Sequence, residues 1–562
     1  MLWKKSTAAL GLSAMVFASS LSGCMGSSTG EQPAGNPVSD VTDGTGNQTA
    51  KNPLSFWIWV DPALNSLDDT YYWAEIERNT GTDIVWQHPA EAQLKEQFNL
   101  IIAGNKLPDI MYYGWQNNYP GGPDAAINDG KIIALNGYID EYAPNFKAYL
   151  DAHPDVKRDI STDSGNIYCF PAIYTNTPED SKTWEGVMGR EPYYETYIGA
   201  FVREDWLKDL NMAAPETLDD WYDMLKSFKE EKGARYPLSF VVQWGTFGQT
   251  FASAYDVTLP RMEANANIAF GLKEDGTIMY GPAEPGYKDY LAFMNKLYMD
   301  GLLDPDFMVQ ESDSVYHKIL TGDTGATVFM TAVAQLAFQA RAEDPDTTFS
   351  MVGVANPVRT EGQELRYFQA GFPFRSDGAA ITTSCTDIPS AMKFLDYLWS
   401  EEGNRLINWG IEGQSYEMVD GWPQFTEQYI NYILENNQNE MLKNRLHNGP
   451  FPMDHQTRIR MKTDYTLPEG ETDQILEALK TWEGNGVMPA GLPPTTLMPE
   501  ESGEYAAKFN EIQTYADEMF AKFIMGQESL DNYDKYVETL YDFGLQDVLD
   551  IQTRALERYN NR

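Results

Sequence analysis

Leu54-Ser-Phe-Trp-Ile-Trp-Val60 is a short, continuous apolar run of the kind that forms a buried β-strand. The residues after it alternate between two patterns, predicting a helix over 68–79, a strand over 82–87, a helix over 91–103 and a strand over 107–113. Gly81 and Gly104 stand where these helices are expected to end. Alternating strands and helices form βαβ units on a parallel sheet, which binds ligands beyond the carboxyl ends of its strands. The stretch therefore predicts an α/β fold with a site at that edge.

The composition describes a large, acidic, globular protein. A length of 562 residues suffices for roughly two to four domains with large cores. The formal charge of −42 repels nucleic acid and excludes it as a partner. A small acidic ligand is not excluded, because screening over roughly 8–10 Å leaves local Arg and Lys side chains in control of a cleft. With only 3 Cys, a large core and not a disulfide framework is expected to hold the fold.

The first residues have the pattern of an export signal. Lys4 and Lys5 precede a run of about ten apolar residues, too short to span a bilayer. Leu21-Ser-Gly-Cys24 follows, and it resembles a bacterial lipoprotein signal. The resemblance implies a signal peptide over 1–23, cleavage before Cys24 and lipidation of its sulfur and freed amine. A plain secretory signal with an incidental cysteine is the alternative.

Residues 24–52 are expected to be a lipidated, flexible tether, because they are rich in Gly, Ser, Thr, Asn and Pro. No later apolar run approaches the length that a membrane helix needs. The lipid alone would then hold the chain to the outer face of the cell membrane.

Motifs spread along the chain resemble those of one known family. They are Leu107-Pro-Asp-Ile110, VREDWL (202–207), PETLDDWYDMLKSFK (215–229), GLKEDGTIMYG (271–281), GIEGQSYEM (410–418) and the closing ALERYN. Together they are similar to the extracellular solute-binding proteins of bacterial carbohydrate importers of the ABC type, family 1. Within that family the chain looks most like the LipO-like or aldouronate-transport lipoprotein branch.

The resemblance implies a two-lobed, periplasmic-binding-protein-like α/β fold of type II, with crossing hinge strands and a helical C-terminal extension. Mapped here, lobe one would comprise residues 53–172 and 350–384, and lobe two would comprise residues 173–349 and 385–562. A ligand gains contacts from both lobes when the hinge closes.

The function implied is capture of an oligosaccharide, with a uronate-bearing one left open, and its delivery to the transmembrane permease of an ABC transporter. The protein would act as a monomer, with no nucleic-acid partner and with the membrane contacted only through the lipid. An oligopeptide-binding lipoprotein and a surface glycoside hydrolase are the alternatives.

Sugar sites stack aromatic rings on the apolar C–H faces of the ligand and add fixed polar groups. The candidate ligand-binding residues are Trp57, Trp59, Asp61, Tyr113, Trp115, Gln116, Tyr174, Arg203, Gln243, Trp244, Arg375 and Trp409. Trp57 and Trp59 share one face of their strand, so at least one of them is open to a core role. Trp115 and Trp244 stand among polar loop residues, and we expect them to line the cleft from opposite sides. Core burial is the competing interpretation for each aromatic.

Arg203 follows a predicted strand, and Arg375 lies near a predicted crossing between the lobes. A guanidinium group binds a uronate carboxylate through two parallel hydrogen bonds. Among 83 Asp and Glu residues, a structural ion pair is the competing interpretation for both.

The sequence favours a binding protein over an enzyme, with no cofactor. It contains no nucleophile elbow, P-loop or HExxH motif, and its 5 His show no ligand spacing. A glycosidase stays open because the spacing of two carboxylates cannot be read from sequence. Asp304, Asp306, Glu311 and Asp313 form an oxygen-rich stretch without the EF-hand pattern, so no metal site is predicted and a structural calcium is left open.

Cys169 and Cys385 fall in two of the crossing segments that the family fold implies. We therefore expect them to be neighbours at the hinge. Export permits a disulfide between them, and two free, buried thiols are the alternative.

Overall fold

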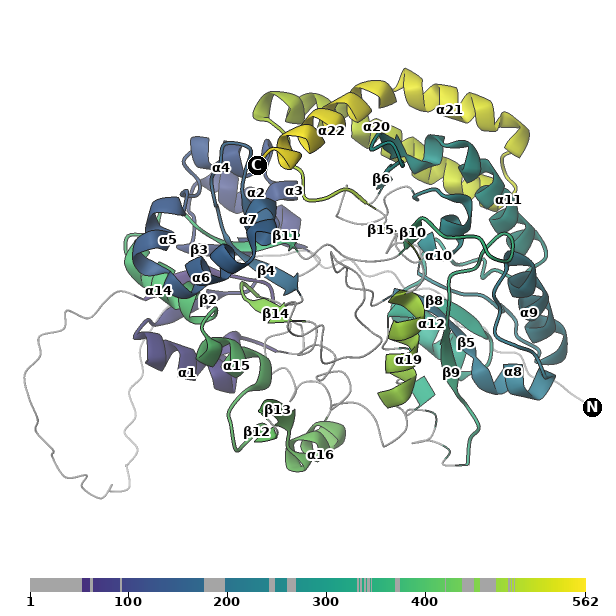
Figure 1. The fold of residues 1–562 in the computed structure, drawn as a ribbon, viewed down its shortest axis with the longest axis horizontal. Coiled ribbons are helices and arrows are strands. Elements are labelled where there is room, and N and C mark those ends of the chain that lie inside the picture. The colour runs from purple at the N-terminus through teal and green to yellow at the C-terminus, as the bar shows by residue number, and fades with distance from the viewer. Residues whose placement is uncertain are drawn as a thin grey trace, which may run out of the picture. The chain divides into compact units, whose positions relative to one another are not determined.

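The computed structural model describes residues 53–562, with gaps at 61–63, 91–92, 176–197, 242–247, 260–268, 331–332, 334–335, 338–339, 341–343, 345, 369–373, 420, 437–448, 455–471, 484–485, 487 and 490. The predicted signal peptide (1–23), Cys24 and the tether (24–52) lie outside the described residues. The described chain forms two α/β lobes (Figure 1). Each lobe has its own hydrophobic core. None of the helices searched in this part of the chain is long and apolar enough to cross a membrane.

Lobe one contains a six-stranded sheet with the order β14-β4-β11-β3-β1-β2. Its strands are β1 (Leu54–Trp57), β2 (Ile84–Gln87), β3 (Ile110–Tyr113), β4 (Phe170–Thr175), β11 (Phe374–Ile381) and β14 (Pro452–Asp454). β1 runs parallel to β2 and β3, which confirms the predicted βαβ arrangement of these strands. β11 lies between β3 and β4 and runs antiparallel to both.

Nine helices contribute to the core of lobe one among the described residues. They are α1 (Tyr71–Thr80), α2 (Leu94–Gly104), α3 (Trp115–Asn118), α4 (Gly122–Asn128), α5 (Asn136–Tyr142), α6 (Pro144–Ala152), α7 (Pro154–Ile160), α14 (Ile388–Tyr397) and α15 (Glu401–Trp409). α1 ends, as predicted, at Gly81, whose φ of 64° is left-handed. α2 instead includes Gly104 and ends at Asn105, whose φ is 52°. Asparagine tolerates that backbone better than most residues, so it also ends helices.

Lobe two contains an antiparallel sheet with the order β8-β5-β9. Its strands are β5 (Ile198–Arg203), β8 (Ala326–Met330) and β9 (Met351–Val354). Its helices are α8 (Glu204–Leu210), α9 (Leu218–Glu231), α10 (Gln249–Ala252), α11 (Pro285–Met299), α12 (Ser312–Leu320), α19 (Thr472–Glu483), α20 (Pro499–Ile524), α21 (Tyr533–Asp542) and α22 (Leu545–Asn560).

Helix α19 packs closely on the sheet of lobe two. A Cβ added to Gly199 would lie 2.1 Å from the ring of Trp482, so only glycine lets the indole lie on β5. The Trp482 indole N–H donates to the Val354 carbonyl at 3.1 Å. The helix is thereby fixed to two neighbouring strands.

The segments that form the two cores differ from the predicted lobe boundaries. Met351 and Val354 belong to the core of lobe two, although the family resemblance places 350–384 in lobe one. Residues of α14 and α15, together with Phe451 and Met453, belong to the core of lobe one, although 385–562 is predicted in lobe two. An amphipathic helix such as α14 carries an apolar stripe that fits either lobe. Its contacts with α1, α5 and α6 decide the assignment.

Smaller elements complete the described structure. These are the hairpin β6 (Phe270–Leu272) with β7 (Ile278–Tyr280), the hairpin β12 (Tyr416–Val419) with β13 (Trp422–Phe425), the pair β10 (Tyr367–Phe368) with β15 (Met488–Pro489), and α16 (Glu427–Asn436).

Candidate ligand-binding site

β3 passes into helix α3 through a tight turn at Gly114. A Cβ added to Gly114 would lie 3.0 Å from Asn118 Nδ2 and 3.1 Å from Asp377 Oδ1, closer than ordinary contacts. The Asn118 side-chain amide donates to the Gly114 carbonyl at 2.9 Å and closes the turn. Tyr113 and Gln116 are therefore presented together at the carboxyl end of β3.

A β-bulge in β11 lies beside this turn. The register of β11 shifts between Phe374 and Gly378, and the buried Ser376 has a φ of 72°. A non-glycine residue in this region is strained, and such strain concentrates at functional sites. Burial raises the pKa of Tyr113, and the nearby Asp377 carboxylate raises it further. The bulge thus brings a carboxylate to the strand end.

Asp377 is a further candidate site residue, which the sequence pattern did not single out. The signal that points to it is Ser376-Asp377-Gly378, because turn-forming residues inside an apolar strand indicate a bulge. The consequence of the bulge depends on Gly378 lying opposite Tyr113. That pairing joins residues far apart in the sequence and could not be read from it.

Trp59, Tyr113 and Gln116 are half-buried at the ends of β1 and β3. Tyr113 packs edge-on against Trp57, with ring centroids 5.8 Å apart and an interplanar angle of 88°. The indole N–H of Trp59 and the side-chain carbonyl oxygen of Gln116 are buried without a hydrogen-bond partner among the described residues. Buried polar groups normally have partners. One donor and one acceptor are therefore left at adjacent strand ends.

The residues 493–496, which we call the strap, lie against α3. The Gln116 side-chain amide donates to the Thr495 carbonyl at 2.6 Å. Thr495 and Thr496 are both buried. The strap follows α19 and precedes α20, so a segment associated with lobe two borders the site on lobe one.

Trp57 and Trp115 are core residues, which corrects their predicted place in the ligand site. Their exposed fractions are 2% and 0%. Trp115 packs on Phe98 of α2 at 5.1 Å, and its indole N–H donates to the Met111 carbonyl at 3.3 Å. The polar residues around Trp115 suggested an exposed loop, but they form the helical turn α3, whose inner face is buried.

Arg203 and Trp409 also have their partners away from the candidate site. The Arg203 Nε and Nη2 donate to the two carboxylate oxygens of Asp205 at 2.8 and 2.6 Å. Both side chains are 9% exposed, so the structural ion pair describes Arg203. Trp409 is buried in a small separate cluster, where it packs on Phe425 at 4.6 Å.

The remaining candidates stay predictions. Asp61, Gln243 and Trp244 lie outside the described residues, and so do the side chains of Tyr174 and Arg375. The backbones of the last two lie in β4 and β11, the strands that meet at the bulge. The expected pairing of Trp115 with Trp244 across a cleft is therefore wrong on the side of Trp115.

The oxygen-rich stretch near Asp304 is an ion-pair network. The fully buried Asp304 accepts from Ser239 Oγ at 2.6 Å and from Lys318 Nζ at 2.5 Å. A cation is thus already supplied by a side chain. In the described part of the chain, no group of three or more His, Cys, Asp or Glu residues could hold a metal ion.

Cys169 and Cys385 are free, buried cysteines in the core of lobe one. Burial raises the pKa of the Cys385 thiol to about 12, and burial likewise raises the pKa of Cys169. Both thiols are therefore protonated and unreactive at neutral pH.

The described chain has a two-lobed α/β fold, with candidate ligand-binding residues at the strand ends of lobe one. Residues 65–405 match the family described as bacterial extracellular solute-binding protein, more than half of the chain. The chain therefore belongs to this family, as the sequence motifs indicated.

Two curated relatives are similar in sequence. Lipoprotein LipO of Bacillus subtilis is 24% identical over 354 residues, which span 62% of this chain and 64% of LipO. The fructooligosaccharide ABC transporter substrate-binding protein FusA of Streptococcus pneumoniae is 23% identical over 511 residues, which span 86% of each chain. The match with LipO thus covers less than two thirds of that protein, whereas the match with FusA extends over most of both chains. Of the two, FusA is named as a substrate-binding protein of an ABC transporter.

A solved structure has the same fold. The alginate-binding protein AlgQ2 superposes with a TM-score of 0.70 over 90% of this chain and 98% of its own, at 23% sequence identity. At this identity the likeness establishes the fold alone. It extends to the helical C-terminal part, which the family match over 65–405 does not reach.

Proposed function

We propose that this protein captures an oligosaccharide outside the cytoplasm and delivers it to the permease of an ABC importer. The main support is a group of half-buried residues at the ends of neighbouring strands, namely Trp59, Tyr113 and Gln116. In this group the indole N–H of Trp59 and the side-chain carbonyl oxygen of Gln116 have no hydrogen-bond partner among the described residues. Aromatic faces suit the C–H faces of a pyranose or furanose, and a donor with an acceptor suits its hydroxyls. Family membership supports transport as the purpose of this binding.

The relatives support both a neutral and an acidic sugar as the ligand. FusA is named for fructooligosaccharides, and AlgQ2 is named for alginate, a polyuronate. The net charge of −42 favours a neutral ligand at long range. Arg375 is the cation that we propose for a uronate, because Arg203 is already paired with Asp205.

The test is a thermal-shift screen of the purified mature protein with 1-kestose, trigalacturonate and a tripeptide mixture. A ligand at 100 times its Kd adds about 2.7 kcal/mol to the free energy of unfolding. We expect a sugar to raise Tm without any increase in reducing ends. New reducing ends would identify a glycosidase, and stabilisation by peptides alone would identify an oligopeptide binder.

A matched pair of variants tests the site within this screen. Trp59→Phe keeps a ring and removes the indole N–H, so we expect affinity to fall about fivefold, equivalent to about 1 kcal/mol for one hydrogen bond. Trp86→Phe is the control, because Trp86 packs on Phe56 and Trp73 on the α1 side of the same sheet. Equal affinity losses in the two variants would remove Trp59 from the site.

We further propose that Cys24 carries the lipid anchor and that the chain acts as a monomer. The support is the sequence Leu21-Ser-Gly-Cys24 and the family's extracellular character. Replacement of Cys24 by Ala in the native host should move the protein from the membrane fraction to the soluble fraction. Retention in the membrane fraction would contradict the anchor.

A further inference from the structure

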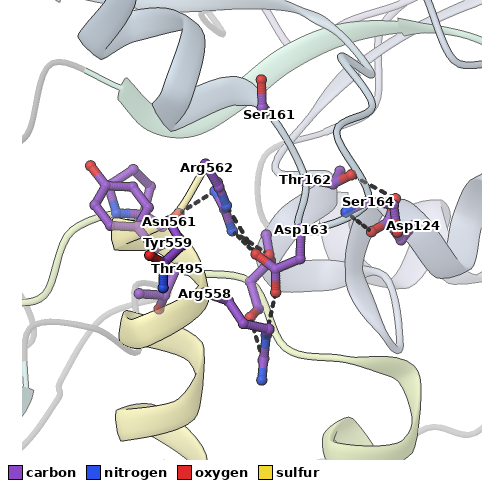
Figure 2. Close-up of polar contacts among 12 residues, drawn as sticks. Asp124, Ser161, Thr162, Asp163, Ser164, Thr495, Arg558, Tyr559, Asn561 and Arg562 are labelled. Carbon is purple, nitrogen blue, oxygen red and sulfur yellow. Dashed lines mark hydrogen bonds and ion pairs between the residues drawn. The ribbon is translucent and has the colours of Figure 1, made fainter.

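Two arginines at the end of helix α22 bind one aspartate of lobe one. Arg562 donates through Nε and Nη2 to Asp163 Oδ1 at 2.9 and 2.7 Å, and Arg558 donates through Nε to Asp163 Oδ2 (Figure 2). The Asp163 side chain is 7% exposed and that of Arg562 is 4% exposed. A carboxylate shared by two guanidinium groups and shielded from water holds both firmly. We call Arg558, Arg562 and Asp163 the arginine clasp.

The same guanidinium groups also contact the strap. Arg562 donates through Nη2 to Thr496 Oγ1 and through Nη1 to the Pro494 carbonyl at 3.5 Å. Arg558 donates through Nη2 to the Thr496 carbonyl at 3.2 Å. The arginines therefore lie between Asp163 and the strap and contact both.

The opposite side of the strap meets the candidate site. The Thr495 carbonyl accepts from the side-chain N–H of Gln116 in α3. The side-chain carbonyl oxygen of the same Gln116 has no hydrogen-bond partner among the described residues. Within the strap, the Thr495 N–H donates to the Pro493 carbonyl at 2.6 Å. The strap is held on two sides, by Gln116 of α3 and by the two arginines.

We propose that the arginine clasp is a positioning device for the ligand-binding site, which fixes the strap against Gln116 through Arg558 and Arg562. Asp163 follows α7 in lobe one, whereas α22 belongs to the core of lobe two. The clasp thereby joins the lobes by a connection separate from the strands of the two sheets. The ligand part of this inference rests on the proposed function, and the coupling of clasp to strap does not.

The chemistry of arginine makes the device specific. Its planar group carries five N–H donors, so it can bind a carboxylate on one edge and carbonyl or hydroxyl oxygens on the other. A lysine has three N–H donors on a single nitrogen at the end of a flexible stem, so it lacks the two rigid edges with which Arg562 binds Asp163 and the strap. Arg562→Lys therefore separates the ion pair from the positioning role.

The experiment is hydrogen–deuterium exchange on the purified, ligand-free protein. In Arg562→Ala we expect the segments 493–498, whose exchangeable amides are those of 495–498, and 115–119 to exchange about tenfold faster, because local opening becomes easier. Arg554→Ala is the matched control: Arg554 lies on α22 one turn before Arg558, binds Glu501 at 2.9 Å and does not contact the strap in the described structure. In the control these amides should keep their wild-type rates.

Two more variants complete the design. Arg562→Lys should retain the thermal stability of the wild type more closely than Arg562→Ala, yet still accelerate exchange at 493–498. Thr496→Val removes the hydroxyl that accepts from Arg562, and the arginine clasp itself stays intact. This variant replaces Arg562→Ala in the experiment if Arg562→Ala fails to fold. If hydrogen–deuterium exchange accelerates only at 158–166 and 554–562, and 115–119 is unchanged, the proposal is wrong. The clasp would then be only a structural contact between the lobes.

Binding measurements then extend the result to the ligand. If 1-kestose or trigalacturonate binds the wild type, Arg562→Ala should raise its Kd about fivefold or more, while Arg554→Ala changes it less than about twofold. If neither sugar binds, the proposed ligand class is wrong, but the exchange rates still decide whether the clasp positions the strap.

Discussion

Arg203 and Arg562 are both buried arginines paired with an aspartate, and they differ in what the pair connects. Arg203 binds Asp205, two residues away, so the ion pair lies within the junction of β5 and α8. Its guanidinium also lies 4.4 Å from the ring centroid of Trp206 and 4.3 Å from that of Phe349. The ion pair and these ring contacts therefore stabilise the packing of lobe two.

Arg562 binds Asp163 at a sequence separation of 399 residues. Its other N–H groups contact the strap, which contacts α3. The local pair stabilises one lobe, and the distant pair fixes one part of the molecule against another. Equal burial therefore does not imply an equal role. The following predictions, from the largest effect to the smallest, test that distinction.

Arg203→Ala should lower the free energy of unfolding by about 3–5 kcal/mol, because it leaves the buried Asp205 carboxylate without its cation. Urea unfolding followed by circular dichroism measures the loss. Exchange at the strap should stay at the wild-type rate, since the described contacts of Arg203 are with Asp205, Trp206 and Phe349. Faster exchange at 493–498 would show that the two arginine sites are coupled.

The Asp159 carboxylate accepts a hydrogen bond from the Tyr559 hydroxyl beside the arginine clasp. Its ionisation should make the free energy of unfolding depend on pH. Burial raises the pKa of Asp159 to about 6 from its ordinary 3.8. The folded state then binds more protons than the unfolded state between those values, so stability falls as pH rises through this window. The fall can reach about 3 kcal/mol.

Asp159→Asn removes this ionisation and keeps an acceptor for Tyr559. The variant should be more stable than the wild type at pH 7, and the difference should disappear near pH 3.5. Urea unfolding at both pH values measures it. A difference that is the same at both values would show that Asp159 does not titrate in this range.

Asp163→Asn should lower the free energy of unfolding by about 2 kcal/mol, because two arginines lose a shared charge but Arg558 keeps Glu501. Unlike Arg203→Ala, it should also speed exchange at 493–498. A stability loss without any change at the strap would make the clasp equivalent to the local pair.

Arg554→Ala should change the free energy of unfolding by less than about 0.5 kcal/mol, because Arg554 is 50% exposed and Glu501 retains Arg558. Thermal denaturation checks this value. A loss comparable to that of Asp163→Asn would mean that Glu501, and not Asp163, is the main anchor of α22.

Part of the candidate site was predictable from local sequence. Trp59, Tyr113 and Gln116 were proposed because residues at the ends of parallel strands gather at one edge, and the structure leaves them half-buried there. The roles of Trp57 and Trp115 were not predictable, since the packing of Phe98 from α2 decides which aromatics are covered. Asp377 was missed because its significance depends on the pairing of β11 with β3.

The sequence by itself determined the α/β class, the parallel strands β1 to β3, the end of α1 at Gly81 and the family. These features depend on hydrophobic periodicity, glycine conformation and motifs, which act over a few residues. Only the tertiary structure decided that α14 and α15 belong to lobe one, that Arg203 is structural and that Arg562 binds Asp163. An apolar stripe or a charge carries no information about its distant partner, so burial and pairing across hundreds of residues are settled only when the lobes pack.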